Sequence, residues 1–144
     1  MRPMQTEHVI ALVSRIRESA NALLVSELAR LGHPDLAPSH GAILAVLYDR
    51  GELPMGALAQ AIGRKKNTLT VLVRKLEQAG YVQRTVSPGD SRVSMIALTA
   101  KGEAFREDFG AISRMLLSRV WGDMEQGQRE VLVQGLERIL VNLG

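Results

Sequence analysis

One change of hydrophobic period, at Gly80, restricts the folds open to this chain. Before Gly80 the apolar residues recur every three or four positions, as on amphipathic helices, and this spacing returns after Thr99. Between these points lie two short runs of β-formers, 81–86 and 93–98, separated by the turn residues 87–91. The pattern predicts a mainly α protein with a small β-hairpin, which is an α+β fold.

Six helices are predicted around this hairpin. In chain order they cover roughly residues 7–31, 39–49, 55–62, 66–79, 99–120 and 126–142. Ser39 and Thr99 are expected to cap the second and the fifth of them, because their hydroxyls accept hydrogen bonds from free backbone N–H groups. Gly63 is expected to end the third helix in the left-handed conformation.

The positive charge of the chain is concentrated in its middle. Residues 54–101 hold eight Lys and Arg against two acidic residues, a net charge of +6, which leaves −3 for the rest of the chain. A basic segment between acidic ends favours a surface that binds a polyanion. Composition alone is equally compatible with a solvated basic face that has no partner.

The third and fourth predicted helices, joined at Gly63, have the proportions of a helix-turn-helix. In this motif the first helix braces the second, whose N-terminal end enters the major groove of DNA. That end is rich in Lys, Arg, Asn and Thr, which neutralise phosphates or contact base edges. The residues of this helix that we expect to contact DNA are Arg64, Lys65, Lys66, Asn67, Thr68, Thr70, Arg74 and Lys75.

The predicted hairpin has the position of a wing, which reaches the neighbouring minor groove. Arg92 follows the turn, where a cationic side chain suits a narrow, electronegative groove. Arg84 and Ser91 complete the DNA contacts expected of the wing. Asp90 is expected to pair with Arg84 or Arg92 and so to hold the wing in shape, although many turn aspartates need no partner.

These motifs resemble those of the MarR family of bacterial regulators. The family's wing signature is matched at each defining position by Asp90-x-Arg92-x-x-x-x-x-Leu98-Thr99-x-x-Gly102. Further agreement comes from Leu76-Glu77-x-x-Gly80-Tyr81-Val82-x-Arg84 and from Leu58-Ala59 before Gly63, and the element order matches over essentially the whole chain. Arg64, Lys65 and Val71 differ from the residues usual in the family, and these differences concern individual base contacts instead of the binding mode.

The resemblance implies a winged helix-turn-helix regulator, expected to be a repressor, that binds a pseudo-palindromic operator in double-stranded DNA as a homodimer. The chain, 1–144, is then one MarR-like domain, with a DNA-binding region at 33–100 and dimerisation helices at 5–32 and 101–144. Long apolar stripes on the terminal helices favour the same assembly, because a small monomer could not bury them. The residues expected at the dimer interface are Leu12, Ile16, Leu132, Leu136, Ile139 and Leu140.

The sequence gives less support for other partners and activities. Many MarR proteins release DNA when a small, phenolic or lipophilic, anionic effector binds, and the resemblance alone implies one here. No metal or cofactor is expected, because cysteine is absent and His33, Asp35 and His40 lack the spacing of a metal site. No phosphate loop, nucleophile elbow or His–carboxylate pair indicates an enzyme. A helical ligand-binding or protein-interaction module without DNA binding is the alternative, but it leaves the basic wing unexplained.

Export and membrane insertion are not predicted either. Residues 1–7 lack the apolar core of a secretory signal, and the longest apolar run, 42–48, is too short to cross a bilayer. We therefore expect a soluble cytoplasmic protein without a membrane partner.

Overall fold

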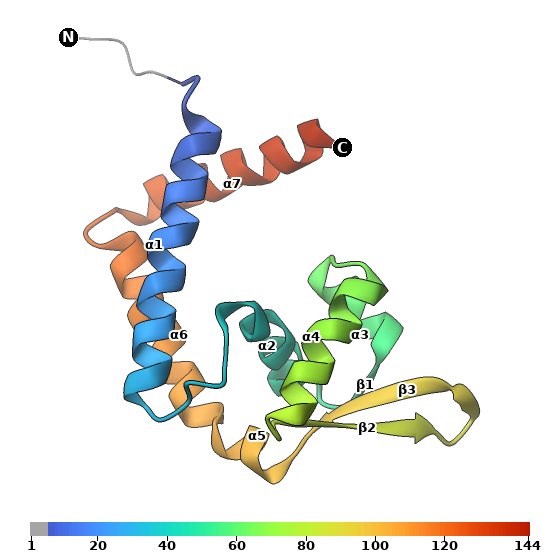
Figure 1. Cartoon of the computed structure of the whole chain (residues 1–144). Coiled ribbons are helices and arrows are strands. Elements are labelled where there is room, and N and C mark those ends of the chain that lie inside the picture. The colour runs from blue at the N-terminus through green and yellow to red at the C-terminus, as the bar shows by residue number, and fades with distance from the viewer. Residues whose placement is uncertain (1–5) are drawn as a thin grey trace, which may run out of the picture. The chain divides into compact units, whose positions relative to one another are not determined.

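A computed structural model describes residues 6–144 of the chain (Figure 1). The beginning of the stretch 1–7, and with it the first residue of the dimerisation segment expected over 5–32, lies outside the described residues. The chain forms two compact units, and the boundary between them falls within helix α6, between Ile112 and Ser113. In the part that the structure describes, no helix is both long and apolar enough to span a membrane.

The first unit is helical except for one small antiparallel sheet (Figure 1). Its helices are α1 (Val9–Arg30), the short 3-10 helix η1 (Pro38–His40), α2 (Gly41–Arg50), α3 (Met55–Ile62), α4 (Lys66–Gln78), α5 (Ala100–Ala104) and the beginning of α6 (Arg106–Trp121). Its strands are β1 (Leu53–Pro54), β2 (Val82–Ser87) and β3 (Asp90–Leu98), in the order β1-β3-β2. The predicted mainly α fold with a hairpin is confirmed, while the short β1 escaped the sequence pattern because two residues carry no periodicity.

The apolar residues of α2, α3, α4 and the sheet share one core. Their spacing of three and four positions on the helices places them on the inner face of each. Burying a large aliphatic side chain of this kind stabilises the fold by about 1.5–3 kcal/mol. The most deeply buried of these residues are Ile43, Leu44, Leu47, Leu58, Leu69, Val73, Leu76, Tyr81, Val82 and Ile96. This core gives the outer face of α4 a rigid support.

Two details of the predicted helices are wrong. Ser39 does not cap α2, because it lies inside η1 and α2 begins after His40 without a side-chain cap. The single helix expected over 99–120 is divided at Phe105, between α5 and α6. The Phe105 ring is buried with its centroid 4.4 Å from that of His33, and packing of this kind between distant residues leaves no mark on the hydrophobic period.

Gly63 and Thr99 act as the sequence predicts. Gly63 ends α3 with a φ of 72°, in the left-handed region. The Thr99 hydroxyl accepts a hydrogen bond from the N–H of Gly102 at 3.1 Å and donates one to the carbonyl of Gly80. A Cβ atom on Gly102 would overlap the carbonyl oxygen of Tyr81, so this position in the wing signature accepts only glycine without a shift of the backbone.

Gly102→Ala should therefore lower the free energy of unfolding by about 1–3 kcal/mol, because the added methyl group pushes α5 away from the backbone of Tyr81. Gly56→Ala is the matched control, since nothing lies within 4 Å of a Cβ at Gly56 in α3 and alanine is the better helix former. Denaturant unfolding measures both variants. Equal stability of the two would contradict this explanation of Gly102.

The second unit consists of residues 113–144. It contains the end of α6 and helix α7 (Gln126–Leu143), which follow each other through a turn with Gly122 at a φ of 52°. The break between the predicted helices 99–120 and 126–142 is thus confirmed. None of the residues of α7 is buried, and Leu132, Leu136 and Leu140 are among its exposed apolar residues.

Candidate nucleic-acid interface

The N-terminal end of α4 is exposed and positively charged. Arg64 and Lys65 precede the helix, which begins at Lys66 without a side-chain hydrogen bond to cap it. The positive end of the helix dipole, and the N–H groups of the first turn other than that of Thr68, add to this charge. Asn67 and Thr68 are exposed beside the three basic residues. Such an end suits phosphate oxygens and the acceptor atoms of bases.

The two faces of α4 differ sharply. Leu69, Val73 and Leu76 are buried against the core, whereas Arg74 and Lys75 are exposed. The predicted DNA contacts of α4 therefore lie on its outer side, with the exception of Thr70.

Thr70 is the exception, and Asn67 also has a local partner. Thr70 is half-buried, and its hydroxyl donates a hydrogen bond to the carbonyl of Lys66 at 2.7 Å. The Asn67 Oδ1 accepts a hydrogen bond from the N–H of Thr68 at 2.9 Å. The amide NH₂ of Asn67 can still donate to another acceptor. The hydroxyl of Thr70 cannot, because its one proton is already donated to the carbonyl of Lys66.

Asp90 and Arg92 form an ion pair at the start of β3. The Nε of Arg92 lies 3.1 Å from Asp90 Oδ1, and the backbone N–H of Arg92 donates to the same oxygen at 3.0 Å. The side-chain hydrogen bond from Arg92 lowers the pKa of Asp90. The Arg92 side chain is nevertheless 87% exposed, so the pair orients the guanidinium while most of its surface stays accessible.

Arg84 does not pair with Asp90. Its Nε lies 3.3 Å from Oε1 of Glu77 on α4, so this pair connects β2 with α4, and the partner of Asp90 is Arg92. The hairpin turn is also shorter than expected, because β3 begins at Asp90 and only residues 88–89 lie between the strands. Ser91 is exposed on β3 next to Arg92.

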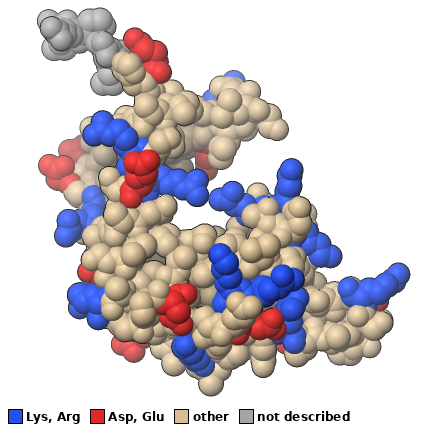
Figure 2. Space-filling model, viewed as in Figure 1, with Lys and Arg blue, Asp and Glu red and all other residues tan. Residues whose placement is uncertain are grey.

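Basic side chains gather over α4 and along the wing. Figure 2 shows these Lys and Arg side chains, with fewer acidic ones among them. The exposed residues of this basic surface are Arg64, Lys65, Lys66, Arg74, Lys75, Arg84 and Arg92. The structure thus brings the helix and wing residues predicted from the sequence into one part of the first unit.

A polar cluster around Tyr81 was not foreseen from the sequence. The buried Tyr81 hydroxyl donates to Asp35 Oδ1 at 3.0 Å and lies 2.8 Å from Nδ1 of His33. Lys101 reaches Asp35 Oδ2 at 3.3 Å and lies over the Tyr81 ring. Burial, and then the hydrogen bond with Asp35, raises the pKa of Tyr81, so its hydroxyl stays protonated. The cluster extends to α6 through Asp108, whose Oδ2 lies 3.4 Å from His33 Nε2.

This cluster connects three parts of the first unit: the loop after α1, the base of the wing and the beginning of α6. It also includes His33 and Asp35, two of the three residues that were considered above as a possible metal site. The third, His40, is buried instead, and its Nδ1 accepts the N–H of Ala37 at 3.0 Å. Burial, and then the nearby charge of Lys75, lowers the pKa of His40.

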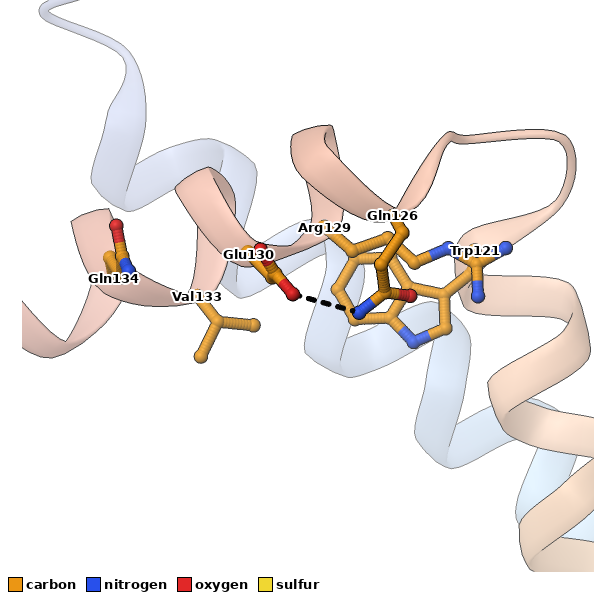
Figure 3. Close-up of a pocket in the computed structure, with 6 residues that line it drawn as sticks. All are labelled: Trp121, Gln126, Arg129, Glu130, Val133 and Gln134. Carbon is orange, nitrogen blue, oxygen red and sulfur yellow. Dashed lines mark hydrogen bonds between the residues drawn. The ribbon is translucent and has the colours of Figure 1, made fainter.

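The second unit has a shallow hollow of about 340 Å³ at the start of α7 (Figure 3). The Arg129 guanidinium lies 5.7 Å from the centre of the Trp121 ring, and its Nε donates to the carbonyl of Met124 at 2.8 Å. The Gln126 Nε2 donates a hydrogen bond to Glu130 Oε1 at 3.3 Å, drawn as a dashed line in Figure 3. Since these polar groups bond within the unit, the hollow is best understood as part of the packing of the turn before α7.

Comparison with known sequences identifies the chain's relatives. The sequence model of the MarR family matches residues 36–94, which include α2 to α4 and most of the hairpin. The chain is 31% identical over 106 residues to the HTH-type transcriptional regulator SarZ of Staphylococcus saprophyticus, covering 74% of this chain and 71% of SarZ. It is 26% identical over 131 residues to the HTH-type transcriptional regulator MhqR of Bacillus subtilis, covering 91% of this chain and 88% of MhqR.

Comparison with solved structures agrees on the fold. The PcaV transcriptional regulator of Streptomyces coelicolor, solved in complex with its natural ligand, superimposes with a TM-score of 0.83. The comparison covers 100% of both chains at 16% identity, which establishes the winged fold alone. The identity to SarZ, the match to the family model and the exposed basic helix and wing lead to one conclusion: this chain belongs to the MarR family and is a DNA-binding transcriptional regulator.

Proposed function

We propose that this protein represses transcription by binding a pseudo-palindromic operator as a homodimer. The observation that carries the proposal is the exposed, basic end of α4 in the same unit as a wing whose Arg92 is oriented by Asp90. In this arrangement α4 enters the major groove and the wing follows the adjacent minor groove. Two-fold symmetry sets two copies of α4 about 34–36 Å apart, one turn of DNA.

The contacts on α4 divide into two kinds. Asn67 and Thr68, in the first turn, contact base edges, because the N-terminal residues of a recognition helix reach deepest into the groove. Arg74 and Lys75, further along the helix, bind phosphates, as most basic residues at such interfaces do. Arg64, Lys65 and Lys66 contact either phosphates or guanine.

The homodimer uses the uncovered apolar residues of the terminal helices. Leu12 and Ile16 of α1 are exposed, as are Leu132, Leu136 and Leu140 of α7, while Ile139 is half-buried. Apolar stripes of this length are rarely left in water by a monomeric protein. A second copy of the chain, with the same stripes, covers them in a symmetric interface.

A small-molecule effector releases the operator in this proposal. PcaV, which shares the fold, was solved with its natural ligand, and this motivates the same kind of control here. A phenolic or lipophilic anion is the expected class. A panel of such compounds, added during an operator titration, tests this part by loss of DNA affinity.

Selection of bound fragments from a library of genomic DNA tests the proposal. Titration of a recovered site at 50 and 200 mM salt should then show a loss of affinity of about 10³-fold or more, as expected for six or more phosphate contacts. Lys66→Ala should reduce this salt dependence, whereas Arg50→Ala, at an exposed arginine that ends α2, should leave it unchanged. Failure to enrich any sequence would overturn the proposed function.

Asn67→Ala and Lys75→Ala separate base contacts from phosphate contacts. Asn67→Ala should change the ranking of operator variants, at a cost of about 1–3 kcal/mol for the lost base contact. Lys75→Ala should weaken all sequences about equally and flatten the dependence on salt. Titration against a set of single-base operator variants measures both. An unchanged ranking with Asn67→Ala would mean that the base-reading face of α4 is assigned wrongly.

A further inference from the structure

We infer that Val71 determines part of the operator sequence by packing against the 5-methyl group of a thymine in each half-site. The inference rests on the proposed function, because it assigns a base preference to the same helix. Val71 lies in the second turn of α4 and is 52% exposed.

Its position on α4 is the first reason. Leu69, Val73 and Leu76 mark the buried face of the helix. At 3.6 residues per turn, Val71 points almost directly away from them, one turn beyond Asn67 on the same side. Within a recognition helix this side faces the floor of the major groove, where base edges are exposed.

Its isolation is the second reason. Among the described residues between β1 and Gly102, the exposed large hydrophobic residues are Val71 and Val86. The outward neighbours of Val71 on α4 are Asn67, Thr68, Arg74, Lys75 and Gln78, all of which are polar or charged. A protein partner would require a contiguous apolar patch, which one valine does not supply.

The chemistry of DNA supplies the matching group. In the major groove thymine alone carries a methyl group, at C5, and apolar side chains discriminate it by contact. Thr70, which was predicted to contact DNA and precedes Val71, is half-buried, and its hydroxyl donates to the carbonyl of Lys66. Val71 is therefore the exposed side chain at the centre of the outer face that presents only methyl groups, whereas the exposed Thr68, one turn earlier, also carries a hydroxyl.

The expected loss of operator affinity is modest for one half-site and larger for both half-sites together. Removing one buried methyl group changes affinity by about fourfold, and the same loss in both half-sites of a symmetric operator by about 10- to 20-fold. Val71→Ala should fold normally, because the position is exposed and alanine is the better helix former.

Replacement of thymine by deoxyuridine tests the inference, because it removes only the 5-methyl group. Synthetic duplexes of the site recovered from the genomic selection would carry deoxyuridine at one pair of symmetry-related thymines at a time. Wild type should lose about 10- to 20-fold in affinity at one such pair. Val71→Ala should bind the unmodified site with an affinity that is lower than that of wild type by a similar factor. Deoxyuridine at that pair should then lower the affinity of Val71→Ala by less than about twofold.

Val86→Ala is the matched control, since it shortens an exposed valine on the wing. It should keep the full response to deoxyuridine at the pair that depends on Val71. An undiminished response at every thymine in Val71→Ala would overturn the inference while leaving the proposed function intact. If no duplex is bound specifically by wild type, the proposed function and the inference fail together.

Discussion

Leu136→Glu should separate the subunits and weaken operator binding by at least about 3 kcal/mol, because it places an unpaired charge from each subunit in an apolar interface. Leu136 is exposed on α7, a helix without a buried residue, so the chain alone gives it little packing to lose. Each subunit would then hold only one half-site. Sedimentation velocity at low micromolar concentration measures the separation of the subunits, and an operator titration measures the loss of affinity. A melting curve checks that the variant is still folded.

Gln134→Glu provides the matched control for this experiment. It adds the same negative charge to α7 two residues away, at an exposed polar position. This variant should remain dimeric and bind the operator like wild type. A Leu136→Glu protein that stays dimeric and keeps its affinity would show that α7 does not form the interface.

Arg92→Ala should cost at least about 2 kcal/mol in operator affinity, because a dimer loses two charge-assisted minor-groove contacts of ~1–2 kcal/mol each. The loss of the arginine also leaves the Asp90 carboxylate without its partner, on a surface that would face phosphates in the proposed complex. The side chain is 87% exposed, so the melting temperature should change little.

Asp90→Ala should give a milder form of the same defect, because it frees the guanidinium from its fixed direction without removing it. Titration of operator DNA with both variants, alongside melting curves, distinguishes the two roles. Full affinity of Arg92→Ala would exclude a minor-groove contact. A large fall in its melting temperature would assign Arg92 a structural role instead.

Much of the helix-turn-helix could be predicted from local sequence signals. The third helix was predicted with the bounds of α3, and the fourth ended one residue beyond α4, because Gly63 and Gly80 end them and apolar spacing fills them. The exposed basic end of α4 followed from the same pattern, since Leu69, Val73 and Leu76 fix the inner face.

What sequence reasoning missed depends on contacts between distant residues. The sequence left open whether Asp90 pairs with Arg84 or with Arg92, because the packing of β2 on α4, which brings Arg84 to Glu77, could not be read from it. The hydrogen bonds of Tyr81 reach residues 46 and 48 positions away, and the division between α5 and α6 follows the packing of Phe105. Hydrophobic period reports which face of an element is buried, and carries no information on such pairs.

A hydroxyl-radical footprint on the recovered operator tests most directly the claim that a symmetric dimer reads DNA with α4 and the wing. We expect two protected regions, related by two-fold symmetry and centred about one helical turn (34–36 Å) apart. Each should be flanked by minor-groove protection that disappears in Arg92→Ala. A single protected half-site would contradict the symmetric dimer, and minor-groove protection that survives in Arg92→Ala would contradict the role of the wing.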